Sequence, residues 1–115
     1  MHEMGIANSV LDAVRRESEL RHGARVTKVG VRIGELAAVD PESLRFCFEA
    51  LVSGSDLEPL ALDLEFCLRR NRCRRCGEVF AVAGYPFTCP KCHSTETEVA
   101  SGDELAFTYM EIEEI

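Results

Sequence analysis

Four cysteines in the second half of the chain form two Cys-x-x-Cys pairs, Cys73 with Cys76 and Cys89 with Cys92, and twelve residues separate the pairs. Each pair places two thiolates on one tight turn, and the spacer is long enough for a hairpin that brings the two turns face to face. Gly77 and Pro90 suit backbones that must turn sharply. Four thiolates make a closed tetrahedral site that suits zinc and leaves no position for a substrate. The spacing therefore predicts a zinc ribbon.

Two other uses of these cysteines are less consistent with the sequence. A redox Cys-x-x-Cys pair would not need the second pair. Rubredoxin-type iron sites use similar turns, including Cys-Pro-x-Cys, and tetrahedral thiolates hold iron as well as zinc. The short spacer and its few aromatic side chains favour zinc.

The first three residues, Met1, His2 and Glu3, form a second set of candidate metal ligands. An α-amino group has a pKa near ~8 and loses its proton readily to a metal. The amine, the amide nitrogen of His2 and its Nδ1 can close two adjoining chelate rings. Three nitrogens in one plane favour Ni(II) or Cu(II), and Glu3 or a group from elsewhere could supply a fourth ligand. From these residues alone, the simpler interpretation is an ordinary histidine at a chain end.

The composition is that of a small globular protein. The chain has 115 residues, of which 46% are hydrophobic, and no run of eighteen apolar residues that could span a membrane. The first residues lack the layout of a signal peptide, so we expect a cytoplasmic protein whose cysteines bind metal rather than form disulfides.

The net charge of −7 is unevenly distributed. Residues 69–93 carry six basic side chains and one acidic, whereas residues 94–115 carry seven acidic and no basic side chains. The simpler interpretation is that the arginines beside the cysteine turns offset the negative charge of a zinc–thiolate cluster. A phosphate-binding patch is the alternative.

Hydrophobic periodicity predicts the elements that must position these sites. Residues 4–20 read as an amphipathic helix ended by His22 and Gly23, and Asp40 and Pro41 read as the cap and first residue of a helix that reaches residue 52. Strands are expected over 25–33, 60–68 and 105–112. The apolar parity changes within 105–112, which a β-bulge would explain. Cys47, Cys67 and His93 read as structural or exposed residues rather than as ligands.

We therefore predict an α+β fold: a small mixed three-stranded sheet with two helices, plus an inserted zinc-ribbon subdomain. The last strand is expected to pair back onto the first module. The expected domains are 1–68 with 97–115, and 69–96 for the ribbon. The sequence permits either a monomer or a homodimer.

Taken in order, the motifs resemble the HypA/HybF family. The resemblance is carried by Met1-His2-Glu3, by residues 31–36 and 43–48, by the four-cysteine ribbon and by residues 110–113, and it covers essentially the whole chain. These proteins are nickel metallochaperones for the maturation of [NiFe]-hydrogenase. The resemblance implies that His2, with the terminal amine and Glu3, binds nickel, and that Cys73, Cys76, Cys89 and Cys92 bind zinc.

The resemblance also implies partners. Nickel would be delivered, together with the GTPase HypB, to the hydrogenase large subunit, and the protein would not itself be an enzyme. Asp40 matches an acidic position linked to the nickel site in some members, although helix capping is a sufficient explanation for it. Whether urease is also served is left open.

Two rival functions have features against them. A nucleic-acid-binding or transcription-associated zinc ribbon would use the arginines beside Cys73 and Cys76, but the acidic total charge and the acidic tail oppose it. An enzyme would need an open metal position, a phosphate loop or a nucleophile motif, and none is visible.

Overall fold

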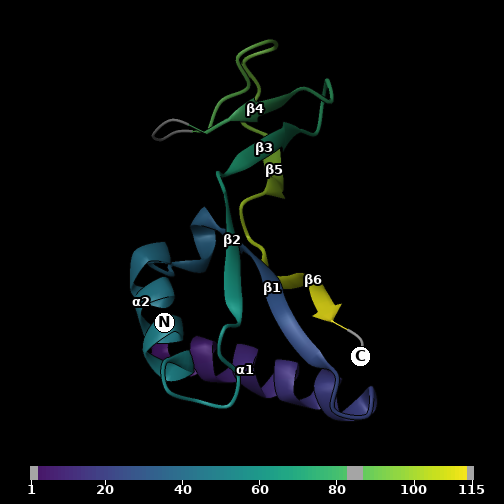
Figure 1. The fold of residues 1–115 in the computed structure, drawn as a ribbon. Helices are drawn as coiled ribbons and strands as arrows, with labels where there is room; N and C mark the ends of the chain where they lie inside the picture. The colour runs from purple at the N-terminus through teal and green to yellow at the C-terminus, as the bar shows by residue number, and fades with distance from the viewer. Residues whose placement is uncertain (1–2, 83–86, 114–115) are drawn as a thin grey trace.

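The computed structural model describes residues 3–82 and 87–113, which fold into two units stacked along one long axis (Figure 1). The overall extents are 56 × 25 × 15 Å. Each unit contains a three-stranded sheet. Two chain segments, one leaving β2 and one entering β6, connect the units (Figure 1).

The first unit contains both helices and a mixed sheet. Its elements are α1 (Glu3–Leu20), β1 (Arg25–Gly34), the short 3-10 helix η1 (Glu35–Ala37), α2 (Pro41–Val52), β2 (Ala61–Cys67) and β6 (Leu105–Glu113). The strand order is β2-β1-β6, with β2 parallel and β6 antiparallel to the central strand β1. The predicted α+β fold with a mixed three-stranded sheet is confirmed, and so is the return of the last strand to the first module.

The hydrophobic core lies between the two helices and one face of this sheet. The buried face of the expected amphipathic helix α1 consists of Ala7, Val10, Leu11 and Val14, which pack with buried side chains of β1 and with Leu44 and Phe48 of α2. Burial along the expected strand 60–68 decreases toward its end, since Phe66 on β2 is 44% exposed and Leu68, just after β2, is 63% exposed.

Two compensating β-bulges keep the apolar residues of β1 and β6 on the helix side. The register passes from Val26↔Ile112 to Lys28↔Glu111, which leaves Thr27 as an extra residue in β1. It then passes from Gly30↔Tyr109 to Val31↔Phe107, which leaves Thr108 as an extra residue in β6. The predicted parity change in the last strand is therefore a bulge, as expected.

The sheet face away from the helices is crossed by one aromatic ring. Tyr109 on β6 lies beside Gly30 on β1, and its hydroxyl donates a hydrogen bond to the Asp63 carboxylate on β2. This bond raises the pKa of Tyr109 to about 12, because ionisation would remove the donated proton and place a second charge beside the carboxylate. A Cβ at position 30 would overlap the ring and the Thr108 hydroxyl.

The helix ends follow the predicted signals. Asp40 caps α2 by accepting a hydrogen bond from the Glu42 backbone N–H at 3.1 Å, and Pro41 occupies the first turn. After α1, both His22 (φ 59) and Gly23 (φ 82) are left-handed.

The second unit is an antiparallel sheet of β3 (Arg70–Cys73), β4 (Val79–Ala81) and β5 (Thr97–Ser101), in the order β4-β3-β5. Residues 97–101 thus pair with β3, whereas the domain boundary expected from the sequence, after residue 96, places them in the first unit. The division of the chain into domains remains a proposal, and on the strand pairing we propose a ribbon of residues 69–101.

Close backbone packing joins the two units. The N–H of Gly34 donates to the Glu104 carbonyl and that of Leu36 to the Gly102 carbonyl, both at 2.7 Å, while the Glu35 carboxylate accepts from the Arg69 N–H at 2.9 Å. Gly34 has no room for a Cβ because the Gly102 carbonyl lies against it. The end of β1 therefore holds both connecting segments.

Neither helix of the described ranges is long and apolar enough to cross a membrane.

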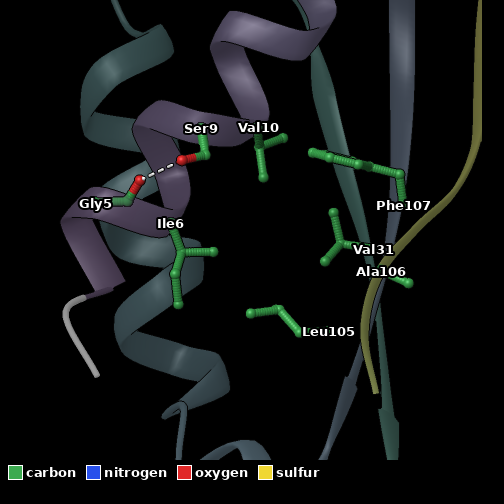
Figure 2. Close-up of a pocket in the computed structure, with 8 residues that line it drawn as sticks. All are labelled: Gly5, Ile6, Ser9, Val10, Val31, Leu105, Ala106 and Phe107. Carbon is green, nitrogen blue, oxygen red and sulfur yellow. Dashed lines mark hydrogen bonds between the residues drawn. The ribbon is translucent and has the colours of Figure 1, made fainter.

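An apolar hollow of about 470 Å³ lies between α1 and the sheet, with Ile6 and Val10 on one side and Val31, Leu105 and Phe107 on the other (Figure 2).

Because the Tyr109 ring lies against Gly30, a single methyl group added at position 30 should destabilise the fold. We expect Gly30→Ala to lower the free energy of unfolding by about 1–3 kcal/mol, because the ring must leave its place and the bond to Asp63 is lost. Gly5→Ala in α1, where a Cβ meets nothing within 4 Å, is the matched control and should stabilise by up to about 1 kcal/mol. Urea denaturation followed by circular dichroism measures both, and a neutral Gly30→Ala would contradict the prediction.

Candidate metal sites

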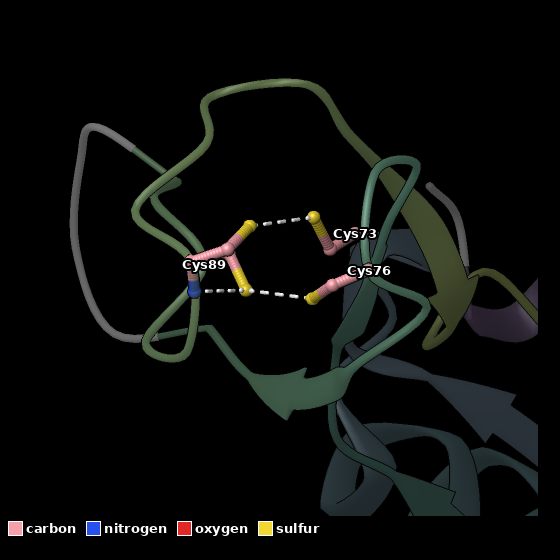
Figure 3. A group of neighbouring side chains, drawn as sticks. Cys73, Cys76 and Cys89 are labelled. Atoms are coloured by element: carbon pink, nitrogen blue, oxygen red, sulfur yellow. Dashed lines mark hydrogen bonds between the residues drawn. The ribbon is translucent and has the colours of Figure 1, made fainter.

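The four cysteine sulfurs of the second unit converge on one point. All four Sγ atoms lie within 4.8 Å of one another, with Cys73 Sγ at 3.5 Å from Cys92 Sγ and Cys76 Sγ at 3.6 Å from Cys89 Sγ. Figure 3 shows Cys73 and Cys76 on one turn facing Cys89 across the gap between two loops. Cys73 and Cys89 are buried, whereas Cys76 and Cys92 are exposed.

The two turns have the same local structure. In each, a backbone N–H two residues after the first cysteine donates to its sulfur at 3.4 Å (Arg75 to Cys73 and Lys91 to Cys89). The fifth residue of each turn donates its N–H to the carbonyl of the first cysteine and is left-handed; these residues are Gly77 (φ 81) and His93 (φ 63). The sequence predicts a sharp turn at Gly77 but gives no such signal at His93, because residues other than glycine are uncommon in this conformation.

Backbone N–H donors give the cysteine thiols different pKa values. The N–H groups of Cys76 and Arg75 lower the pKa of Cys73 to about 6, and equivalent donors lower the pKa of Cys89. For Cys76 the Glu78 N–H favours the thiolate, but burial and the neighbouring cysteines outweigh it and raise the pKa to about 12. The first cysteine of each turn is thus the better thiolate.

This donor set fits a tetrahedral zinc ion. A zinc ion with four sulfurs at about 2.3 Å requires sulfur–sulfur separations of about 3.8 Å, close to the two short distances observed. Zinc binding must displace the protons that the second cysteines retain, so the affinity of the site falls as the pH is lowered.

No other candidate ligand reaches this cluster within the described residues. His93 is exposed and is not among the converging groups. Cys47 and Cys67 also lie outside it. Burial, together with Glu104 and Glu65, raises the pKa of Cys67, so its thiol is held in the protonated form.

The predicted nickel ligand His2 lies outside the described residues, as does Met1. Glu3, the first residue of α1, is described. Its Oε2 accepts a hydrogen bond from the Asp40 backbone N–H at 3.2 Å, which joins the start of α1 to the start of α2. Sequence reasoning missed this contact, since no local pattern reports how two helices pack.

The Asp40 carboxylate is already occupied by capping. Its Oδ1 accepts from the Glu42 N–H, and its Oδ2 accepts from the Ser43 hydroxyl at 3.0 Å. Glu3, Asp40 and Glu42 nevertheless line one shallow depression at this end of the unit. Three carboxylates around an open depression make a surface that attracts cations.

The chain was compared with known proteins. A family model described as "Hydrogenase/urease nickel incorporation, metallochaperone, hypA" matches residues 1–112. The chain belongs to the HypA family. Two relatives named hydrogenase maturation factor HypA, from Chlorobium limicola and Prosthecochloris aestuarii, are each 40% identical to it. The alignments cover 99% and 98% of this chain and 98% and 100% of the relatives, respectively.

Solved structures agree with the fold. The solution structure of a HypA protein matches at 25% identity with a TM-score of 0.71, covering 97% of this chain and 96% of that one. The solution structure of the Ni metallochaperone HypA from Helicobacter pylori matches at 24% identity with a TM-score of 0.63, covering 97% of each chain. The resemblance read from the sequence is confirmed: this HypA chain is a member of a metallochaperone family that serves hydrogenase maturation, and not of an enzyme family.

The left-handed residues of the two turns make a matched pair for mutation. We expect His93→Gly to retain zinc and to stabilise the metal-loaded ribbon by about 1 kcal/mol, because glycine adopts this conformation without strain. Gly77→Ala should destabilise it by a similar amount. Competition with a chromophoric zinc chelator measures both variants. Loss of zinc in His93→Gly would mean that the imidazole is a ligand after all.

Proposed function

We propose that this HypA protein carries one Ni(II) ion at its N-terminus for delivery during [NiFe]-hydrogenase maturation, and one structural Zn(II) ion in the ribbon. Family membership over residues 1–112 carries the proposal for nickel. The convergence of four sulfurs within 4.8 Å carries the proposal for zinc. In this proposal Cys73, Cys76, Cys89 and Cys92 bind zinc, and His2, the Met1 amine and Glu3 bind nickel.

The chemistry of the two donor sets fits two different tasks. A closed thiolate site contributes of order ~10 kcal/mol of binding free energy to a small ribbon and exchanges its metal slowly. A cargo site has to release its ion, so it uses few protein ligands, open to attack by a competing ligand set. Nitrogen ligands from an amine, an amide and an imidazole suit a square-planar Ni(II) ion.

The surroundings of Glu3 support the placement of nickel beside α1 and α2. Glu3 is tied to the backbone of Asp40 through one oxygen, and the nearby carboxylates of Asp40 and Glu42 add negative charge. They would attract a divalent cation without closing a cage around it. Protonation of the amine and of His2 would weaken nickel binding as the pH falls toward about 6.

The proposed partners are the GTPase HypB and the hydrogenase large subunit, in the cytoplasm. Nucleic acid is not an expected ligand. The ribbon arginines lie beside a cluster that is formally negative when it holds zinc, and one of them, Arg74, already pairs with Glu98 at 3.4 Å.

Removal of one zinc ligand should unfold the ribbon and leave the first unit folded. In Cys73→Ser we expect loss of zinc and loss of hydrogen-exchange protection in β3, β4 and β5, while the α1–β1–α2 core stays protected because it has its own apolar packing. Cys67→Ser, at a thiol outside the cluster, is the control and should keep its zinc. Zinc retained at full stoichiometry by Cys73→Ser would argue against the four-thiolate site.

Nickel titration tests the N-terminal site. Zinc-loaded His2→Ala should fold normally and lose specific nickel binding, and addition of one residue before Met1 should have the same effect because it displaces the amine. Calorimetry on untagged protein measures both. Unchanged titrations would show that nickel binds elsewhere.

Two conservative variants then separate ligation from structure near this site. Asparagine caps helices as well as aspartate, so Asp40→Asn keeps the acceptor for the Glu42 N–H at the start of α2, while it removes the charge and the acceptor for the Ser43 hydroxyl. Glu3→Gln likewise keeps an oxygen acceptor for the Asp40 N–H. We expect Glu3→Gln to weaken nickel binding and Asp40→Asn to leave it within a few fold of the parent.

A further inference from the structure

Strand β6 forms an open edge of the first sheet. Its one strand neighbour within the described residues is β1, and α1 packs mainly against α2 and β1. Residues 105–110 carry no charged side chain. Three large side chains of this strand are exposed: Leu105 at 43%, Phe107 at 49% and Tyr109 at 38%. An uncharged, apolar edge of this kind is a template for pairing with another strand.

The opposite edge of the same sheet is protected in the usual way. On β2, the Arg45 guanidinium donates to the Leu62 carbonyl at 3.2 Å and so blocks part of the edge. Charged residues alternate along β2, with Asp63 bonded to Tyr109 and Glu65 paired with Arg32 at 2.9 Å. The β2 edge therefore carries charged side chains and is partly blocked by Arg45, whereas residues 105–110 of the β6 edge carry no charge.

The apolar hollow lies directly beside the open edge. Leu105 and Phe107 line it from β6, and Ile6 and Val10 line it from α1 (Figure 2). An added strand would place alternate side chains over this hollow while its backbone bonded to β6. A helix could fill the hollow but would leave the edge groups of β6 without strand partners.

A second copy of β6 is a poor occupant because of charge. Acidic residues flank the uncharged stretch on both sides: Asp103 and Glu104 before it, Glu111 and Glu113 after it. Antiparallel self-pairing centred on Phe107 would oppose Asp103 to Glu111. A shift by one position opposes Glu104 to Glu111, and a further shift opposes Asp103 to Glu113. Each of these three pairings has two-fold symmetry and repeats the repulsion, and like charges directly opposite one another destabilise a sheet.

These acidic flanks are available to a basic partner. Lys28 and Arg25 lie opposite Glu111 and Glu113 on β1, yet among the residues that the structure describes they form no ion pair with them. We propose that the β6 edge and the adjoining hollow dock an extended segment of a partner protein, with alternating apolar side chains and with lysine or arginine at both ends.

The bulge at Thr108 limits the length over which an added strand can pair with β6. It interrupts the regular edge after Phe107, so the added strand pairs regularly over residues 105–107, beside the hollow. A short ladder with charged ends gives fast, reversible association. The proposal goes beyond nickel and zinc binding and does not depend on either site.

A synthetic peptide with alternating valine and threonine between two pairs of lysines tests the proposal. Titration into the zinc-loaded, ¹⁵N-labelled full chain should shift the amide resonances of β6 and of the α1 residues at the hollow. Phe107→Lys should weaken binding at least about tenfold, because it places a cation in the apolar hollow. Phe46→Lys is the matched control: Phe46 is 72% exposed on α2, away from β6, and its replacement should leave binding unchanged.

A charge-reversal variant makes the test independent of packing. Asp103→Lys combined with Glu111→Lys changes two exposed side chains and should reverse the preference, from the lysine-ended peptide to one ended by glutamates. The absence of β6 shifts with the lysine-ended peptide, or an equal loss in Phe46→Lys, would overturn the proposal. A dimer in sedimentation that Phe107→Lys converts to a monomer would overturn it in favour of a second copy.

Discussion

The described part of the ribbon has little inside it besides the cysteine sulfurs. The buried apolar cluster of the protein is built from α1, β1, α2 and the residues that flank α2, and no described residue of 69–101 belongs to it. Among the described residues of the ribbon, those that are buried are Asn71, Cys73, Cys89 and Ser94. An interior of this kind offsets little of the conformational entropy that a sheet of short strands loses on folding, so a metal ion bound by the four cysteines would supply much of the stability of the ribbon.

What remains of the ribbon interior is a polar network at its base. The Asn71 side chain donates to the Thr97 hydroxyl at 3.1 Å, which in turn donates to the Phe87 carbonyl at 3.2 Å. Arg69 lies over the Phe87 ring at 4.2 Å and donates to Asn71. These bonds align β3 with β5 next to the junction of the two units, where Gly34 and Gly102 are in contact. The ribbon thus has the four-cysteine cluster at its tip and side-chain hydrogen bonds at its base.

The first unit is stabilised in a different way from the ribbon. Its stability comes from apolar packing between helices and sheet, well away from Glu3 and Asp40. The separation of the two sources of stability allows ligands at one end to change without unfolding the whole chain. The outer edge of β6 has no strand partner among the described residues, because β6 is the last strand of the sheet.

The sequence by itself determined the features that depend on local chemistry. Cysteine spacing specified the thiolate cluster, the Asp40-Pro41 signal specified the start of α2, and the parity change in residues 105–112 specified a bulge. The motif order also led to the HypA family. In each case the information lies in residues a few positions apart, or in a motif whose spacing alone defines it.

Only the tertiary structure decided the features that join distant segments. The pairing of residues 97–101 with β3, the contact of Glu3 with Asp40 and the Tyr109–Asp63 bond all join residues at least twenty-four positions apart. Such contacts depend on how helices and strands are stacked, which no local periodicity encodes. The left-handed conformation of His93 belongs with them, since it follows from the geometry of the turn and a non-glycine residue gives no clear sequence signal for it.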